Sequence, residues 1–264
     1  RLQTDPRRET GMELAEFVSR LDDRLATDAY SDVDASANGL QVGPTEATVE
    51  HAAFAVDAAE ATITAAADAD SDVLVVHHGL SWGGIERVTD RQYERIAALV
   101  DNDIALYVSH LPLDGHQTLG NAAVLADLLD LDATEPFGSM GPVTVGQQGA
   151  APASLTRAEL TTTLEAELET DDLQVLDFGP ENIDQVAIVT GSGTDWLDEA
   201  REVGADTLIT GEGKQQVYHR AREAGINVIL AGHYATETGG VQRLRALTEE
   251  WGLTTSYHSH PTGL

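Results

Sequence analysis

The sequence predicts an α/β protein built from two similar units that are related by internal duplication. Strand-like apolar runs alternate with helix-like stretches in both halves of the chain, which is the pattern of parallel α/β units. Corresponding apolar runs open the two halves, at 53–56 and at 187–190. Each half also closes on a histidine that is followed four residues later by a carboxylate. Repeats of this kind indicate shared architecture first.

The spacing inside the two halves supports the duplication. Phe54 and Val73 are 19 residues apart, and so are Ile188 and Thr207. After that the copies differ in length, because the first carries about eleven extra residues before its closing histidine. We expect this insertion around 81–90.

The first half begins with an amphipathic helix over 13–27, whose apolar residues recur at helical spacing. Residues 38–43 then predict a turn and a short strand. Strand, helix, strand, helix and strand follow over 52–110, and a further helix is expected over 121–131.

The second half begins after 134–150, where glycine, proline and polar residues indicate a domain boundary. The elements expected after it are a helix over 154–168 capped by Ser154 or Thr156, a strand over 174–178, a second strand-helix-strand-helix-strand unit over 186–231, a helix over 241–251 and an edge strand in the tail 254–264. Within the second unit, Gly225 should end a helix over 214–224.

Domain boundaries follow from these elements. Residues 12–131 and 232–264 are predicted to form the first α/β domain, which would carry most of the candidate ligands, and 132–231 the second. Residues 1–11 resemble a tag remnant or a mis-started leader before Met12.

Composition restricts the function classes. The 264 residues include 45 acidic and 15 basic side chains, which gives a formal charge of −30. Such acidity with a single lysine indicates adaptation to high salt, where a dense carboxylate shell stays hydrated and its self-repulsion is screened. It disfavours nucleic-acid binding, which uses basic patches. The absence of cysteine from the sequence excludes thiolate ligands and a cysteine nucleophile, and no apolar run is long enough to cross a membrane. We expect a cytoplasmic protein.

His77 and His78 follow the apolar run 73–76, so they stand at the carboxyl end of a predicted parallel strand. Open α/β sheets bind ligands at that edge. Neighbouring strand residues point to opposite faces, so two adjacent histidines suit two ions side by side better than one. An isolated doublet would more often be one core and one exposed histidine. The His-x3-acid motif at two further strand ends favours a metal site.

The two motifs complete a ligand set. Asp114 from the first, and His233 and Glu237 from the second, join the histidine doublet to give five nitrogen and oxygen ligands. This set is sparse for one hard cation and natural for two divalent metals that share a carboxylate and a water.

Two further residues have open roles. His110 is a sixth ligand, a partner that orients Asp114, or a proton shuttle, and the orienting role is favoured. Glu212 occupies the position of the doublet in the second copy, so it either reaches the site or is a plain turn residue. Gly191-Ser-Gly193 could cradle a phosphate, although a tight strand-to-helix turn explains it equally well.

These motifs together resemble the GTP cyclohydrolase 1 type 2 homologue family, also called Nif-three-like dinuclear metal-centre hexameric proteins. The resemblance covers nearly the whole chain from Met12. It depends on six ordered motifs, namely the segments 38–43, 76–79, 110–114 with 120–121, 190–193, 210–212 and 231–239.

The resemblance implies a two-metal centre on His77, His78, Asp114, His233 and Glu237, a Nif-three-like fold of two α/β domains, and a homohexamer. Zinc, iron, manganese or nickel would all suit the ligands. The implied activity is a metal-dependent hydrolase in which hydroxide attacks C8 of guanine, opens the imidazole ring and releases formate, while His110 or Glu212 moves the proton. A metal-dependent phosphoesterase and a non-catalytic metal-binding scaffold or metal chaperone stay open as alternatives.

Overall fold

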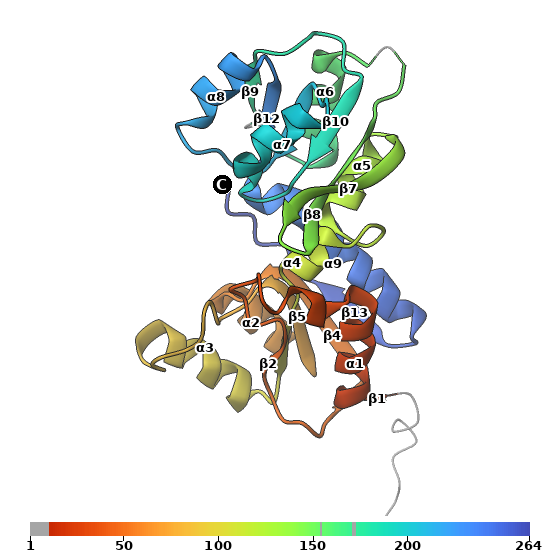
Figure 1. Ribbon diagram of the computed structural model, residues 1–264. Helices are drawn as coiled ribbons and strands as arrows, with labels where there is room; N and C mark the ends of the chain where they lie inside the picture. The colour runs from red at the N-terminus through yellow and green to blue at the C-terminus, as the bar shows by residue number, and fades with distance from the viewer. Residues whose placement is uncertain (1–10, 154, 171–172) are drawn as a thin grey trace, which may run out of the picture. The chain divides into compact units, whose positions relative to one another are not determined.

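The computed structural model describes residues 11–153, 155–170 and 173–264, and it divides them into two compact units (Figure 1). Unit 1 contains the described residues up to Pro112 together with Val241–His260, and unit 2 contains Leu113–Gly240 and Pro261–Leu264. Residues 113–131 and 232–240, which the sequence assigns to the first domain, therefore pack with the second unit. The leader predicted for 1–11 lies outside the described residues except for Gly11.

Unit 1 is built on a five-stranded sheet with the order β13-β4-β5-β6-β2. The strands are β2 (Gly39–Val42), β4 (His51–Asp57), β5 (Val73–His78), β6 (Ala105–Val108) and β13 (Thr254–Tyr257), and the helices are α1 (Leu14–Leu25), α2 (Glu60–Asp68) and α3 (Asp90–Asp101). All neighbouring strands run parallel except β2, which pairs antiparallel with β6. A 3-10 turn (η2, Thr27–Tyr30) and a two-residue ladder of β1 (Met12–Glu13) with β3 (Thr48–Val49) complete the unit.

Strands β4, β5 and β6 are buried along almost their whole length, because both faces of a parallel sheet are covered. Their side chains are mostly alanine, valine and leucine, and they pack with Ile63 of α2 and Leu99 of α3 in one apolar cluster. This core fixes the carboxyl ends of β5 and β6, where the predicted histidines begin. The edge strand expected in the tail is present as β13.

Unit 2 is built on a six-stranded sheet with the order β7-β8-β10-β11-β12-β9. Its strands are β7 (Asp132–Met140), β8 (Val143–Ala150), β9 (Gln174–Asp177), β10 (Gln185–Ile188), β11 (Thr207–Thr210) and β12 (Asn227–Leu230). Its helical elements are the last three residues of α4 (Leu111–Gly115), α5 (Asn121–Leu128), α6 (Arg157–Glu167), η3 (Gly193–Trp196), α7 (Leu197–Glu202), α8 (Val217–Ala224) and the first part of α9 (His233–Glu250). Strands β10, β11 and β12 are parallel, and β9 pairs antiparallel with β12.

The strand order confirms the duplication. In unit 1 the parallel strands β4, β5 and β6 are followed in the sheet by β2, which precedes them in the chain and runs antiparallel. In unit 2 the strands β10, β11 and β12 are followed by β9 in the same way. The register agrees as well, since Ala52 pairs with Val73 and Val186 with Thr207.

The copies also share a polar contact that fixes this register. The Asp72 carboxylate accepts hydrogen bonds from two successive backbone N–H groups at the start of β4, at 2.7 and 2.8 Å. The Asp206 carboxylate does the same at the start of β10, at 2.8 and 3.1 Å. Each aspartate stands one residue before the second strand of its copy. Both copies therefore join their first two parallel strands with the same side chain.

Two expectations for unit 2 were wrong in detail. The segment 134–150, where a domain boundary was expected, lies inside unit 2 as part of the antiparallel hairpin of β7 and β8, which extends the sheet next to β10. Helix α9 begins at His233 rather than at Val241. Glycines 239 and 240, which interrupt the helical pattern, are needed because a Cβ at either position would strike Val124 or Asn121 of α5.

Helix α6 has the cap that the sequence suggested, because the Thr156 hydroxyl accepts from the Glu159 backbone N–H and the Glu159 carboxylate accepts from Thr156. The alternative cap Ser154 lies outside the described residues. Among the helices of the described residues, none is both long and apolar enough to span a bilayer.

Candidate metal centre

Three histidines of unit 1 meet at the carboxyl edge of its sheet. His77 and His78 are the last two residues of β5, and His110 follows the neighbouring parallel strand β6 by two residues. Their ring centroids are 4.6 Å (His77 to His78), 5.1 Å (His77 to His110) and 5.7 Å (His78 to His110) apart. One ring nitrogen of each lies within 4.8 Å of the others, a spacing at which they could bind the same metal ion or two adjacent ions.

Each of these imidazoles has its Nδ1 next to an acceptor that carries no hydrogen of its own. Nδ1 of His77 lies 2.8 Å from the backbone oxygen of Ser109. Nδ1 of His78 lies 2.9 Å from the Asp57 carboxylate, and Nδ1 of His110 lies 2.9 Å from the Asp34 carboxylate. Nδ1 must therefore donate in all three rings, so the neutral form presents the lone pair of Nε2. Metal-binding histidines are oriented in this way.

Asp34 is the centre of a buried polar network that positions His110. One carboxylate oxygen accepts from His110 Nδ1, and the other accepts from the backbone N–H of Leu111 at 3.0 Å. The Ser36 backbone N–H and the Asn38 side chain, each at 2.8 Å, also donate to it. Burial acts to raise the pKa of Asp34, and these hydrogen bonds outweigh burial, so the pKa lies below its usual value. Asp34 is therefore a fixed anion that holds both the imidazole and the start of α4.

Unit 2 contributes two buried carboxylates. Asp114 lies in α4, where one of its oxygens accepts from Asn121 Nδ2 at 2.8 Å and from Thr190 Oγ1 at 3.0 Å. Glu237 lies in α9, and one of its oxygens is within 4.8 Å of an Asp114 oxygen. Two buried anions at this separation repel each other strongly in a medium of low dielectric. A divalent cation between them would remove that repulsion.

His233 is the first residue of α9 and lies between two carboxylates of the same unit. Its Nε2 is 3.2 Å from Glu237, and its Nδ1 is 3.3 Å from Glu212. The hydrogen bond to Glu237 raises the pKa of His233 to about 9, burial opposes this change, and Glu212 adds to it. The metal-free side chain is therefore an imidazolium near neutral pH.

The glycine-rich turn 191–193 approaches this carboxylate cluster closely. A Cβ on Gly191, whose φ is +59°, would collide with the Glu237 carboxylate, so no larger residue fits without displacing Glu237. The backbone N–H of Gly191 donates to Thr236 Oγ1 at 3.2 Å, and that of Gly193 donates to Thr210 Oγ1 at 2.8 Å. These amides are engaged inside the protein, which favours the tight-turn interpretation over a phosphate cradle.

The residues predicted from sequence fall into two groups that agree with the units. His77, His78 and His110 come together in unit 1, and Asp114, His233, Glu237 and Glu212 lie in unit 2. The two His-x3-acid motifs are offset by one residue. Val76 pairs with Val108 and Thr210 with Leu230, so His110 follows its strand by two residues and His233 by three.

Sequence reasoning missed the side chains that orient these groups. Asp34, Asp57 and Thr190 are 76, 21 and 76 residues from the groups that they contact. A signal exists for Asp57, because it ends the strand that lies next to the histidine doublet in the sheet. Asp34 has a weaker one in the spacing of Asp34, Ser36 and Asn38, which is typical of a polar turn.

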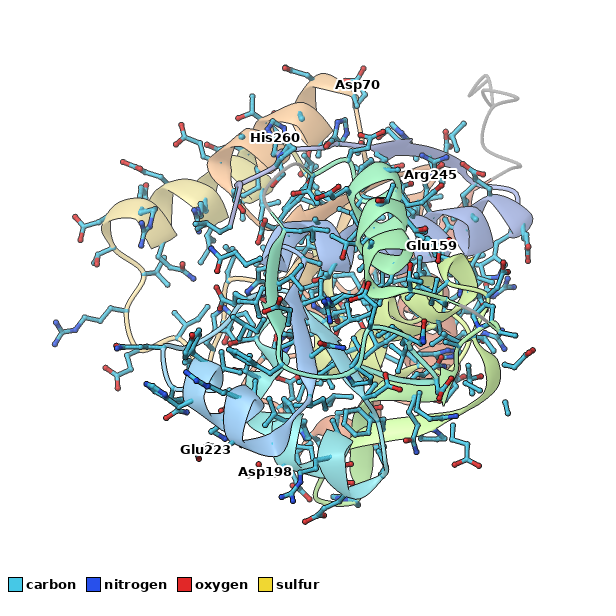
Figure 2. All side chains as sticks on the ribbon, turned by 90° about the horizontal axis from the view of Figure 1, so that it is seen from above. Asp70, Glu159, Asp198, Glu223, Arg245 and His260 are labelled. Atoms are coloured by element: carbon cyan, nitrogen blue, oxygen red, sulfur yellow. The ribbon has the colours of Figure 1, made fainter. Side chains whose placement is uncertain are left out.

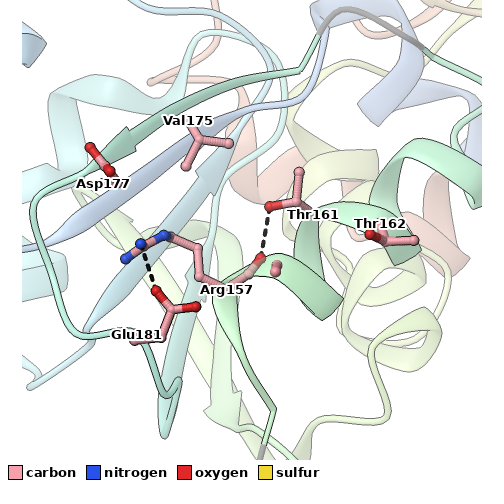
Figure 3. A pocket seen from close by; sticks show the side chains of 7 residues that line it. Arg157, Thr161, Thr162, Val175, Asp177 and Glu181 are labelled. Carbon is pink, nitrogen blue, oxygen red and sulfur yellow. Dashed lines mark hydrogen bonds and ion pairs between the residues drawn. The ribbon is translucent and has the colours of Figure 1, made fainter.

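A separate hollow of about 490 Å³ lies on unit 2 and is lined by residues of α6 and β9 and by Glu181 (Figure 3). The Arg157 guanidinium that faces it is paired with Glu181 at 2.7 Å. None of the predicted site residues lines this hollow. Lys214, which is also outside that hollow, is paired with Asp195 at 2.8 Å.

The donor set of each unit suits divalent ions of intermediate hardness. Imidazole nitrogens and carboxylate oxygens bind zinc, iron, manganese and nickel. The oriented imidazoles of unit 1 and the close carboxylates of unit 2 are groups that could hold a metal.

Comparison with known proteins identifies the family. Residues 12–259 match the model of the Duf34/NIF3 (NGG1p interacting factor 3) family. A Halobacterium salinarum protein named GTP cyclohydrolase 1 type 2 homolog is 54% identical over 96% of this chain and 100% of its own length. A protein of the same name from Pyrococcus abyssi is 41% identical with the same coverage. The solved structure of TTHA1606 from Thermus thermophilus superimposes with a TM-score of 0.87 at 37% identity, over 96% of this chain and all of that one. The chain belongs to the Duf34/NIF3 family.

Proposed function

We propose that this protein binds two divalent metal ions and hydrolyses the ring of a purine nucleotide. The observation that carries the proposal is the common orientation of His77, His78 and His110, each with Nδ1 donating to a fixed acceptor. One such imidazole is common in a protein core. Three at one sheet edge are expected where Nε2 lone pairs converge on metal or on a reacting group.

The proposed ligands are the five predicted from sequence, namely His77, His78, Asp114, His233 and Glu237. Adjacent strand residues project to opposite faces, so the two histidines of the doublet would each bind one ion. The close pair of Asp114 and Glu237 supplies the negative charge that two divalent ions require. His233 would bind through Nε2 after it loses its proton, while Nδ1 donates to Glu212.

When bound, the ions would supply hydroxide near neutral pH by lowering the pKa of a shared water. His110 has the geometry of a general base, because Asp34 holds it in the Nδ1–H tautomer and leaves Nε2 to accept a proton. Glu212 lies 3.3 Å from Nδ1 of His233 and is positioned to orient that imidazole by accepting its Nδ1–H.

The names of the relatives support guanine nucleotides as the substrate class. Hydrolysis of both C8–N bonds of guanine consumes two waters and releases C8 as formate. The test is formate release from GTP by the metal-loaded protein in molar KCl, together with phosphate release as a readout of phosphoesterase activity. Formate production supports the proposal. Phosphate alone assigns a phosphoesterase, and neither product over a nucleotide and phosphoester screen assigns a metal-binding scaffold.

The metal site has its own test, which does not need activity. Metal analysis of the purified protein should give about two equivalents of divalent transition metal per chain. Glu237→Ala should remove at least half of it, because a buried anionic ligand is lost. Glu250→Ala changes an exposed carboxylate on the same helix and should leave the content unchanged. Less than one equivalent in the wild type, unchanged by Glu237→Ala, contradicts the assignment.

We further propose a homohexamer, which the family resemblance supports. Light scattering after gel filtration in molar KCl should give six times the 28.1 kDa chain mass. A monomer or dimer would contradict it.

A further inference from the structure

Trp82 is the exposed aromatic side chain that adjoins the imidazole cluster. The residue is 47% exposed. Its indole ring stands edge-on to His110, with centroids 4.8 Å apart and an interplanar angle of 81°, and lies 6.0 Å from His78. The Trp82 side chain therefore presents a large apolar surface to solvent directly beside His110 and His78.

The backbone around Trp82 is fixed to the segment that carries Asp34. Trp82 forms an isolated bridge with Ser36, Gly83 N–H donates to the Ala35 oxygen at 2.6 Å, and Ala37 N–H donates to the Ser81 oxygen at 3.2 Å. Asp34 in turn binds His110. One short segment thus sets the positions of both the indole and the imidazole, so the exposed ring has a defined place relative to His110.

The space after Trp82 is open. Gly83 and Gly84 have φ values of +70° and +104°, and a Cβ on either would meet no atom within 4 Å. A flat molecule can therefore approach past two residues that present no side chain.

The charge of the protein bears on which part of a nucleotide, the phosphate or the base, it can recognise. With a formal charge of −30, the surface repels phosphate groups at long range, and molar salt screens any local attraction. Stacking of a heteroaromatic ring on an indole depends on apolar contact and dispersion, which salt does not weaken. A base stacked on Trp82 would lie beside His110 and His78.

We propose that Trp82 is the substrate-recognition residue of the site and binds a planar heteroaromatic ring of the purine type by stacking. This inference rests on the proposed function for the placement of the ring next to the reacting groups. It adds the part of the substrate that is recognised and the residue that recognises it.

The experiment compares guanosine monophosphate with ribose 5-phosphate by titration calorimetry in 2 M KCl, because the two share sugar and phosphate and differ in the ring. The wild type should bind guanosine monophosphate more tightly. Trp82→Ala should weaken that binding by roughly 5- to 150-fold, the range found for the loss of one base–aromatic stack, and leave ribose 5-phosphate unchanged. Trp82→Phe, which keeps an aromatic face, should recover most of the affinity.

Tyr93→Ala is the matched control, because Tyr93 is also an exposed aromatic residue of unit 1, at 60% exposure, and should leave both affinities unchanged. Metal content and the thermal midpoint of Trp82→Phe should match the wild type. Equal binding of the two compounds by the wild type, or unchanged binding of guanosine monophosphate by Trp82→Ala, overturns the inference. The inference is also overturned if Trp82→Ala changes the oligomeric mass and leaves guanosine monophosphate binding unchanged, because the indole would then belong to a contact between subunits. The calorimetry measures binding and needs no turnover. If guanosine monophosphate binding depends on Trp82 but GTP yields no formate, the proposed reaction is wrong and this inference stands.

Discussion

At the scale of single residues, the site depends on side chains that hold other side chains. The candidate ligands could be predicted from sequence, because histidine doublets and His-x3-acid motifs are local patterns. Asp34 and Asp57 were not predicted, since the only signals for them, a polar turn around Asp34 and the strand end at Asp57, do not specify which imidazole each contacts. Their partners are defined only when the strands are placed side by side.

Asp34→Ala tests the importance of that positioning. The change removes the acceptor of His110 and the anion that binds the first N–H of α4, so we expect activity or metal affinity to fall by about 10- to 100-fold. Competition with a chelator and the formate assay measure the two effects. Asp32→Ala, an exposed neighbour, is the control. An Asp34→Ala protein with the kcat and metal affinity of the wild type would show that His110 needs no orienting anion.

His233 gives a prediction of pH dependence. Its pKa is raised from 6.5 to about 9 in the metal-free protein, so the imidazolium stabilises the fold fully below pH 6.5. This stabilisation decreases as the pH rises through about 9. A proton NMR titration of metal-free protein should place the His233 midpoint near 9, and Glu237→Gln should move it down. A midpoint at 6.5 in the unaltered chain would mean that the pairing with Glu237 does not form in solution.

The same shift affects metal binding. Coordination through Nε2 requires the neutral ring, so loading at pH 7.5 should expel close to one proton from His233. Calorimetry in buffers of different ionisation enthalpy measures that proton. The effect should vanish in His233→Ala.

At the scale of elements, the segments with strong hydrophobic periodicity were predicted correctly. The predictions for the glycine-rich segments were wrong. The five elements over 52–110 and those over 186–231 are present, because buried parallel strands and amphipathic helices leave clear patterns. The hairpin of β7 and β8 was missed, since its glycines and two prolines resemble those of a domain boundary. Helix α9 was predicted too short, because its paired glycines serve close packing against α5 and not a helix end.

The duplicated aspartates give an element-scale test. Asp72→Ala and Asp206→Ala each remove an acceptor for two backbone N–H groups, so each should lower the free energy of unfolding by about 1–3 kcal/mol. Urea unfolding in molar KCl measures this, and Asp101→Ala on an exposed helix end is the control. Similar losses are expected because the contacts are equivalent. If only one of the two variants lowers the free energy of unfolding, the two aspartates share the same contact geometry but do not contribute equally to stability.

At the scale of the whole molecule, charge is the dominant property. The acidic side chains are spread over both units, and Asp198 and Glu223 lie on the outside of unit 2 (Figure 2). Asp198 is 74% exposed even though Arg220 contacts it. Repulsion among 45 carboxylates opposes folding when little salt is present.

The thermal midpoint should therefore rise steadily from 0.1 M to molar KCl. Circular dichroism at pH 7 measures it, and sucrose at matched osmolality is the control for solvent exclusion. The gain should shrink as the pH falls towards the sequence pI of about 4.3, where many carboxylates are neutral. A midpoint that does not depend on salt would contradict the role assigned to the acidic surface.

The backbone oxygen of Ser109 that orients His77 has one more consequence. Asp57 and Asp34 can each be replaced by mutation, and the imidazole next to them would then be free to flip. A substitution at position 109 changes the side chain but keeps the backbone oxygen that contacts His77 Nδ1, because every amino acid has a backbone carbonyl. The acceptor that orients His77 is therefore kept whatever residue occupies position 109. Among related sequences, substitutions of the orienting residues should be found at positions 57 and 34, where they change the acceptor of His78 or His110.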